Sequence, residues 1–126
     1  MSWSSPFFSK EEMTCQCGCG TEAMDEQFME ALTALRAAWE KPMTVTSGYR
    51  CPNHPIEAKK PKPGTHSTGR AVDLAIEGEE ALDLLTLILI HDFTGIGVQQ
   101  KGSYRFLHID NLLQEEGWPR PTIWSY

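Results

Sequence analysis

Apolar side chains recur at helical spacing in the segment 25–40. They follow one another at intervals of four, three and four residues: Phe28, Leu32, Leu35 and Trp39. Residues at these intervals share one face of a helix. Pro42 lies just beyond the pattern, where a helix is expected to have ended. The spacing predicts a helix over 25–40 that packs this stripe into the core.

Alternating and β-branched segments predict a sheet around this helix. Strands are expected over 43–49, 71–77, 94–100, 104–111 and 122–126, because apolar and polar side chains alternate there or β-branched residues gather. A second helix is expected over 78–92, and "SKEE" at 9–12 fits a capping box. This order predicts a small α+β fold in one domain, 1–126, with an antiparallel sheet flanked by helices.

Composition and charge exclude several classes of protein. The 126 residues, 40% of them hydrophobic, suit one compact domain. A net charge of −6 argues against nucleic acid as a partner. The longest apolar run, 81–90, is too short to cross a membrane. The first residues lack the pattern of a signal peptide, so we expect synthesis in a cytoplasm. We expect a monomer, because no heptad pattern is present.

Four cysteines leave three alternatives open. Three lie in "CQCGCG", as Cys15, Cys17 and Cys19, and Cys51 follows "SGYR". They are consistent with buried free thiols that tie the N-terminal segment to the core, with a zinc site or with disulfides. The C-x-C spacing matches zinc knuckles less well than C-x2-C does. Synthesis in a cytoplasm lowers the expectation of disulfides.

Asp73 raises a chemical question, because it lies in the apolar strand "AVDLAIE". A buried carboxylate is costly unless it is paired or binds a metal. His108 lies on another predicted strand, and His66 lies on the loop that enters the strand of Asp73. If the two strands are neighbours, His66, Asp73 and His108 converge. Two imidazoles and a carboxylate suit zinc, with a fourth position left for water.

Two further residues suit hydrolysis at such a site. Asp110 follows His108 by two positions and so shares its face of the strand. It is expected to act as the general base and acid, since it is the best placed carboxylate. Arg50 is expected to stabilise an oxyanion or to bind a substrate carboxylate.

Several motifs together resemble the M15 zinc peptidases. They are "VTSGYRCPNHP", "THSTGRAVDLAI", "TGIGVQQ" and "FLHIDN", in that order. They look most like the small branch found in phage lysins and tail-associated proteins, and the family's fold is shared with the hedgehog signalling domain. The resemblance implies zinc ligands at His66, Asp73 and His108. It also implies substrate contacts from the "SGYR" residues Ser47, Tyr49 and Arg50.

The sequence departs from the family pattern at two positions. Gly64 stands where the family has a serine, and Arg105 stands where many members have an acid three residues before the last histidine. The resemblance implies a zinc peptidase that cuts peptide bonds of bacterial peptidoglycan, as a carboxypeptidase or an endopeptidase. Such a protein would act at the cell wall as a phage lysin or virion component. The alternative is a non-catalytic zinc-containing module that binds the wall or serves in a phage particle.

Overall fold

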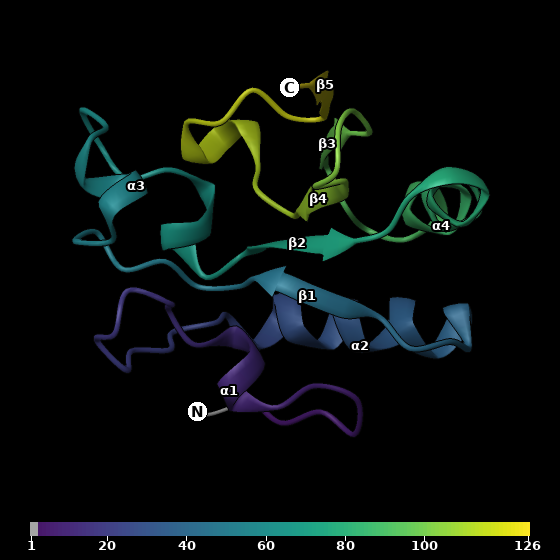
Figure 1. Ribbon diagram of the computed structural model, residues 1–126, viewed down its shortest axis with the longest axis horizontal. Helices are drawn as coiled ribbons and strands as arrows, with labels where there is room; N and C mark the ends of the chain where they lie inside the picture. The colour runs from purple at the N-terminus through teal and green to yellow at the C-terminus, as the bar shows by residue number, and fades with distance from the viewer. Residues whose placement is uncertain (1–2) are drawn as a thin grey trace.

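Five strands form one sheet in the computed structural model, which describes residues 3–126 (Figure 1). They are β1 (Thr44–Ser47), β2 (Ala71–Ala75), β3 (Gly95–Gln99), β4 (Phe106–Asp110) and β5 (Thr122–Ser125), in the order β1-β2-β4-β3-β5. Each strand lies within its predicted segment. The sheet is mixed rather than wholly antiparallel, because β5 pairs with β3 in parallel. The chain reaches the free edge of β3 through a long connection, which lets it run in the same direction.

Within residues 3–126, four α-helices and two 3-10 turns accompany the sheet. They are α1 (Lys10–Met13), α2 (Glu26–Trp39), α3 (Pro55–Ala58), η1 (Thr65–Thr68), α4 (Gly78–Ile90) and η2 (Gln114–Glu116). The predicted capping box is confirmed: Ser9 Oγ accepts from the Glu12 N–H at 3.2 Å, and Glu12 Oε1 accepts from the Ser9 N–H at 2.8 Å. The carboxylate of Asp25 caps α2 in the same way, by accepting from the Phe28 N–H. The small α+β fold is therefore confirmed.

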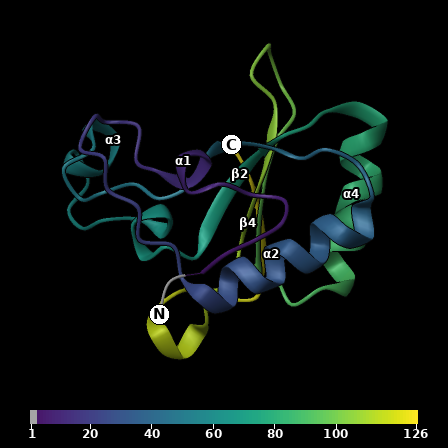
Figure 2. The same cartoon turned by 90° about the horizontal axis from the view of Figure 1, so that it is seen from below.

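The hydrophobic core lies between the sheet and the two long helices. Figure 2 shows α2 and α4 on one side of the strands and α3 on the other. The predicted stripe of α2 is buried, and it meets side chains from the facing side of the sheet: Val72, Leu74, Ile96, Leu107 and Ile109. Because side chains alternate along a strand, the residues between these point to the opposite face. Asp73 and His108 therefore lie on the face turned away from α2 and α4.

The segment 50–69 between β1 and β2 contains α3 and η1. Its two ends are joined by a hydrogen bond from the Arg50 N–H to the His66 carbonyl, at 3.2 Å. The Ser67 hydroxyl also donates to the Arg50 carbonyl, at 2.7 Å. These bonds close the long loop, and they hold η1 beside the start of β2.

Candidate metal centre

Three potential ligands meet on the face of the sheet opposite the core. The pairing of β2 with β4 sets Asp73 directly across from His108, and η1 brings His66 to the same point. Asp73 Oδ1 lies 3.2 Å from His66 Nε2 and 3.0 Å from His108 Nδ1. All three side chains are buried. The structure thus brings together the three residues that the sequence pointed to.

A backbone contact determines which nitrogen of His66 faces Asp73. His66 Nδ1 lies 2.8 Å from the carbonyl oxygen of Gly48. A carbonyl only accepts, so Nδ1 carries the proton and donates it. In the neutral ring the lone pair of Nε2 therefore lies on the side of Asp73, where it is available to a metal. Gly48 belongs to "SGYR", so one role of this motif is to orient a histidine.

Asp110 orients His108 from the opposite side of its ring. His108 Nε2 lies 2.8 Å from Asp110 Oδ2. Arg120 donates to both oxygens of the same carboxylate, from Nε at 2.9 Å and from Nη2 at 2.8 Å. The ionised Asp110 accepts the Nε2 proton, so that in the neutral ring the Nδ1 lone pair lies on the side of Asp73 and is available to a metal. A histidine ligand held by a carboxylate in this way is common in zinc sites.

The pKa shifts of the cluster follow from these contacts. Burial alone would raise the pKa of Asp73, but without a metal the facing ring nitrogens of His108 and His66 donate hydrogen bonds to it and hold this pKa well below its usual range. Burial likewise opposes ionisation of Asp110, yet His108 and Arg120 lower its pKa to about 2. Burial lowers the pKa of His108, and the contacts with Asp110 and Asp73 outweigh this and raise it. Both carboxylates are therefore ionised at neutral pH.

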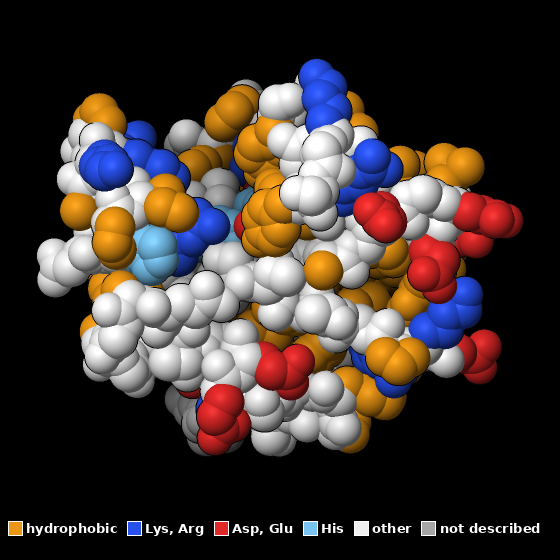
Figure 3. Space-filling model, viewed as in Figure 1, with side chains coloured by type: hydrophobic (Ala, Val, Ile, Leu, Met, Phe, Trp, Pro, Cys, Tyr) orange, Lys and Arg blue, Asp and Glu red, His pale blue; other side chains and the backbone are white. Residues whose placement is uncertain are grey.

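A cleft of about 300 Å³ opens above these residues. Its lining combines the cluster with cationic and aromatic side chains: Arg50, Ile56, Lys60, Thr65, His66, Asp73, Phe106, His108, Trp124 and Tyr126. The rings of Trp124 and His108 lie 5.1 Å apart between centroids. Figure 3 shows Lys and Arg side chains gathered at the left, over α3, whereas Asp and Glu lie mainly to the right and below. The cleft thus opens beside a basic part of an acidic protein.

Arg50 lies at the side of this cleft, between two carboxylates. Its Nη1 is 3.2 Å from Glu57 Oε2, and its Nη2 is 3.8 Å from Asp73 Oδ2. Glu57 is buried, and it also accepts from the Gly64 N–H at 2.7 Å and from Lys60. Burial opposes ionisation of Glu57, but these donors lower its pKa. A side chain at Gly64 would meet Lys60 and Glu57, so the glycine there makes room for this ion pair.

The structure separates the other expected site residues from the cleft. Asp110 has no exposed surface, and both of its oxygens are engaged, which does not suit the expected proton transfer to substrate. Ser47 is buried opposite Asp73 in β1, and Tyr49 packs against the core. Neither is among the described residues that line the cleft. Arg105 points elsewhere and pairs with Glu77 at 3.7 Å.

Sequence reasoning missed several residues of the site, among them Glu57, Arg120, Trp124 and Tyr126. A signal existed for the last two, since β5 was predicted with aromatic residues at alternate positions. The two glycines of "GIG", Gly95 and Gly97, were a second signal in the sequence. A side chain at Gly97 would meet Trp124 and Tyr126, and one at Gly95 would meet Asp110 and Arg120. No local pattern marks Glu57 or Arg120.

The donor set fits zinc. Zn–N and Zn–O bonds of about 2.0–2.1 Å set neighbouring tetrahedral donors roughly 3.3 Å apart, close to the 3.0 Å and 3.2 Å between the atoms of the cluster. Two neutral imidazoles and one carboxylate are also the residue types of catalytic zinc sites, which keep a fourth position open. Here the open side faces the cleft. A second group of candidate ligands, the four cysteines, lies elsewhere.

A buried set of two histidines and an aspartate at the floor of a cleft is the arrangement of a mononuclear zinc hydrolase. Residues 6–110 match the family model described as Peptidase M15, so the chain belongs to the M15 peptidase family and is a metallopeptidase. A comparison with curated proteins gave no significant match. Among the described residues, the structure contains no helix that is long and apolar enough to cross a membrane.

Proposed function

We propose that this protein hydrolyses peptide bonds in the stem or cross-link peptides of bacterial peptidoglycan, with one zinc ion held by His66, Asp73 and His108. The observation that carries this proposal is the convergence of the three donor atoms beneath a cleft, in a chain of the M15 family. The proposed place of action is accordingly the bacterial cell wall, in a phage lysin or a virion-associated protein.

Hydrogen bonds to Gly48 and Asp110 orient the two histidines for metal binding. Zinc, when bound, polarises a substrate carbonyl and lowers the pKa of water. His66 and His108 each present a lone pair, because the Gly48 carbonyl and the Asp110 carboxylate hold their remaining protons. Asp73 supplies the negative charge. In this proposal Asp110 is a positioning residue that acts through His108.

The cleft suits a short peptide that carries carboxylates. Arg50 and Lys60 supply positive charge on one side, and Phe106, Trp124 and Tyr126 supply apolar surface on the other. Arg50 also lies within reach of an oxyanion formed next to Asp73. Burial raises the pKa of Tyr126, so its hydroxyl stays protonated at neutral pH and can donate a hydrogen bond to substrate.

Digestion of purified peptidoglycan tests this function. Zinc-loaded wild type is expected to release new amine termini or free D-alanine, and His66→Ala and Asp73→Ala are expected to abolish release. Free D-alanine would identify a carboxypeptidase, and new termini without it an endopeptidase. His91→Ala is the matched control, because His91 is the C-cap of α4 and is not among the described residues that line the cleft. Full activity in His66→Ala or Asp73→Ala would contradict the proposal.

One observation favours a second candidate, a non-catalytic wall-binding or phage structural module. Asp73 is the one carboxylate among the described residues that line the cleft, and it belongs to the ligand set. The described lining of the cleft therefore offers no carboxylate besides Asp73 that would act as a general base. If zinc-loaded wild type binds wall fragments but releases neither amine termini nor D-alanine after prolonged incubation, this second function replaces the first.

A further inference from the structure

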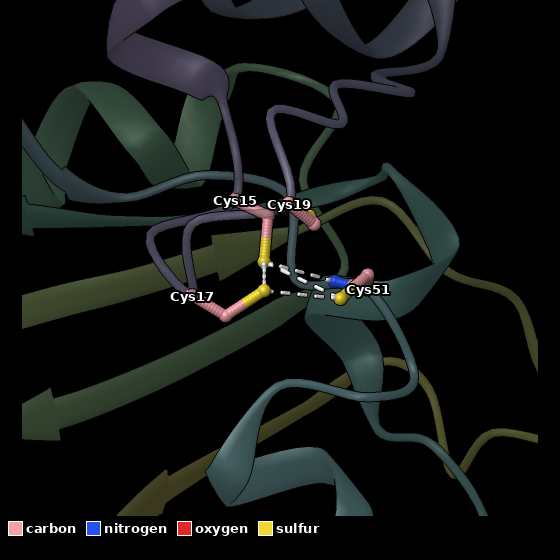
Figure 4. A group of neighbouring side chains, drawn as sticks. All are labelled: Cys15, Cys17, Cys19 and Cys51. Atoms are coloured by element: carbon pink, nitrogen blue, oxygen red, sulfur yellow. Dashed lines mark hydrogen bonds between the residues drawn. The ribbon is translucent and has the colours of Figure 1, made fainter.

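The four cysteines meet at one point, although Cys51 is far from the others along the chain. Figure 4 shows the side chains of Cys15, Cys17 and Cys51 pointing toward one another. Their Sγ atoms form a triangle with sides of 3.5, 3.7 and 3.4 Å. All four Sγ atoms, including that of Cys19, lie within 4.8 Å of one another. This cluster shares no residue with the His66, Asp73 and His108 site.

These distances match a tetrahedral metal site. Zn–S bonds of about 2.3 Å set the four sulfur atoms of a tetrahedron roughly 3.8 Å apart. From Cys15, Cys17, Cys19 and Cys51 we infer a second, structural metal site that binds Zn²⁺ through four thiolates. Binding displaces the four thiol protons. The inference does not depend on the proposed substrate or on catalysis.

The backbone of "CQCGCG" is folded to bring alternate cysteines together. In a strand, side chains two residues apart lie roughly 6.7 Å apart along the chain, much farther than the 3.5 Å between the sulfur atoms of Cys15 and Cys17. Gly18 and Gly20 have φ of +97° and +72°, a region that favours glycine. The turn they allow draws Cys17 and Cys19 back toward Cys15. The two glycines therefore give the C-x-C-x-C spacing a geometry suited to one ion.

Backbone donors also point at the sulfur atoms. The Cys51 N–H donates to Cys15 Sγ at 3.3 Å, and the Thr21 N–H donates to Cys19 Sγ at 3.4 Å. Donors of this kind stabilise thiolate charge. Cys15 and Cys51 are buried, whereas Cys17 and Cys19 are exposed. The site is thus open to an ion on one side and anchored in the protein on the other.

The location gives the site a structural role. Cys51 directly follows Arg50, and Cys15 lies just after α1. The Tyr49 N–H donates to the Met13 carbonyl at 3.0 Å, and Gln16 donates to the Thr46 carbonyl at 2.8 Å. A metal held by all four cysteines would fasten the N-terminal segment to β1 and to the loop that carries Arg50. Because the unfolded chain has no such site, the free energy of metal binding would add to the stability of the folded state.

Elemental analysis of three purified full-length proteins tests the second site. Wild type is expected to hold two zinc ions per chain. Cys17→Ser/Cys19→Ser should hold one zinc ion, because it lacks two of the four thiolates. It should still fold, since both changed side chains are exposed. His66→Ala/Asp73→Ala should also hold one zinc ion. An unchanged zinc content in the cysteine variant would overturn the inference. So would a wild type with a single zinc that the His66→Ala/Asp73→Ala variant loses.

Cobalt provides a measurement that does not need the cysteine variant to fold. The His66→Ala/Asp73→Ala protein, loaded with Co²⁺, should show thiolate-to-cobalt charge-transfer absorption and the intense visible bands of a tetrahedral ion. Denatured wild type with chelator should contain four free thiols. Fewer thiols would reveal a disulfide, and bound iron with sulfide would reveal a cluster; either result would overturn a zinc site. Lack of peptidase activity would affect only the proposed function.

Discussion

Asp110→Asn separates a positioning residue from a general base. The substitution keeps the shape of the side chain and removes its charge. Asp110 accepts from Nε and Nη2 of Arg120 and from His108 Nε2, all within 2.9 Å. An asparagine has only one carbonyl oxygen for these three donors. Its NH₂ group would face at least one of the N–H groups of Arg120 or His108, and two donors cannot bond to each other. His108 then loses the partner that fixes its ring and tautomer.

The expected loss of stability in Asp110→Asn follows from the burial of Asp110 and Arg120 and from the lowered pKa of Asp110. A pKa lowered from 3.8 to about 2 corresponds to a preference of roughly 2 kcal/mol for the ionised carboxylate. Arg120, only 8% exposed, also loses its counter-charge. Removing one partner of a buried ion pair costs about 3–5 kcal/mol, so we expect a loss in this range. Weaker orientation of a histidine ligand should lower zinc affinity by about 10- to 100-fold.

Three measurements check the reasoning. Urea denaturation of the metal-free protein at pH 7 gives the free energy of unfolding, and competition with a chelating dye gives zinc affinity. Hydrolysis at saturating zinc gives kcat, which should return close to the wild-type value. Asp92→Asn is the control, since Asp92 is exposed. Unchanged zinc affinity together with a fall in kcat of about 10²- to 10⁴-fold, the usual contribution of a general base, would refute the positioning role of Asp110.

Three other changes have defined outcomes. Gly69→Ala should destabilise the fold by at least about 2 kcal/mol in urea denaturation, because Gly69 has φ +75° and an added Cβ would collide with the Ala23 carbonyl; an unchanged midpoint would contradict this. Arg50→Lys should lower kcat/KM by roughly 10- to 100-fold without loss of zinc, because lysine lacks the planar fork that spans Glu57 and Asp73; elemental analysis and steady-state kinetics check it. Acid should destabilise the metal-free protein between about pH 4 and 2: the lowered pKa of Asp110 gives stability that is complete above its unfolded pKa and disappears as pH falls through about 2. His108, whose pKa is raised, contributes in the opposite sense, with stability lost as pH rises through its folded pKa. Asp110→Asn should therefore flatten the acid limb of a pH-dependent denaturation series, and an acid limb as steep as that of wild type would count against the assignment.

The secondary structure and much of the site could be predicted from local patterns. The helix over 26–39 follows from its apolar stripe, since helical periodicity depends only on nearby residues. The alternation of β4 puts His108 and Asp110 on one face for the same reason. An aspartate within the apolar β2 indicated a metal because burial of an unpaired carboxylate is costly. These inferences need no knowledge of which strands pair.

The tertiary structure decided what depends on long-range packing. The register of β2 with β4 sets Asp73 across from His108, and a slip of one residue would have reversed the faces. Arg120 reaches Asp110 only because β5 returns parallel to β3, and this contact is the reason we propose Asp110 as a positioning residue rather than the general base expected from its position in the sequence. Cys51 meets the other cysteines because α1 lies against the end of β1. Periodicity is a local property of the chain, whereas register and side-chain convergence are determined by how whole elements pack.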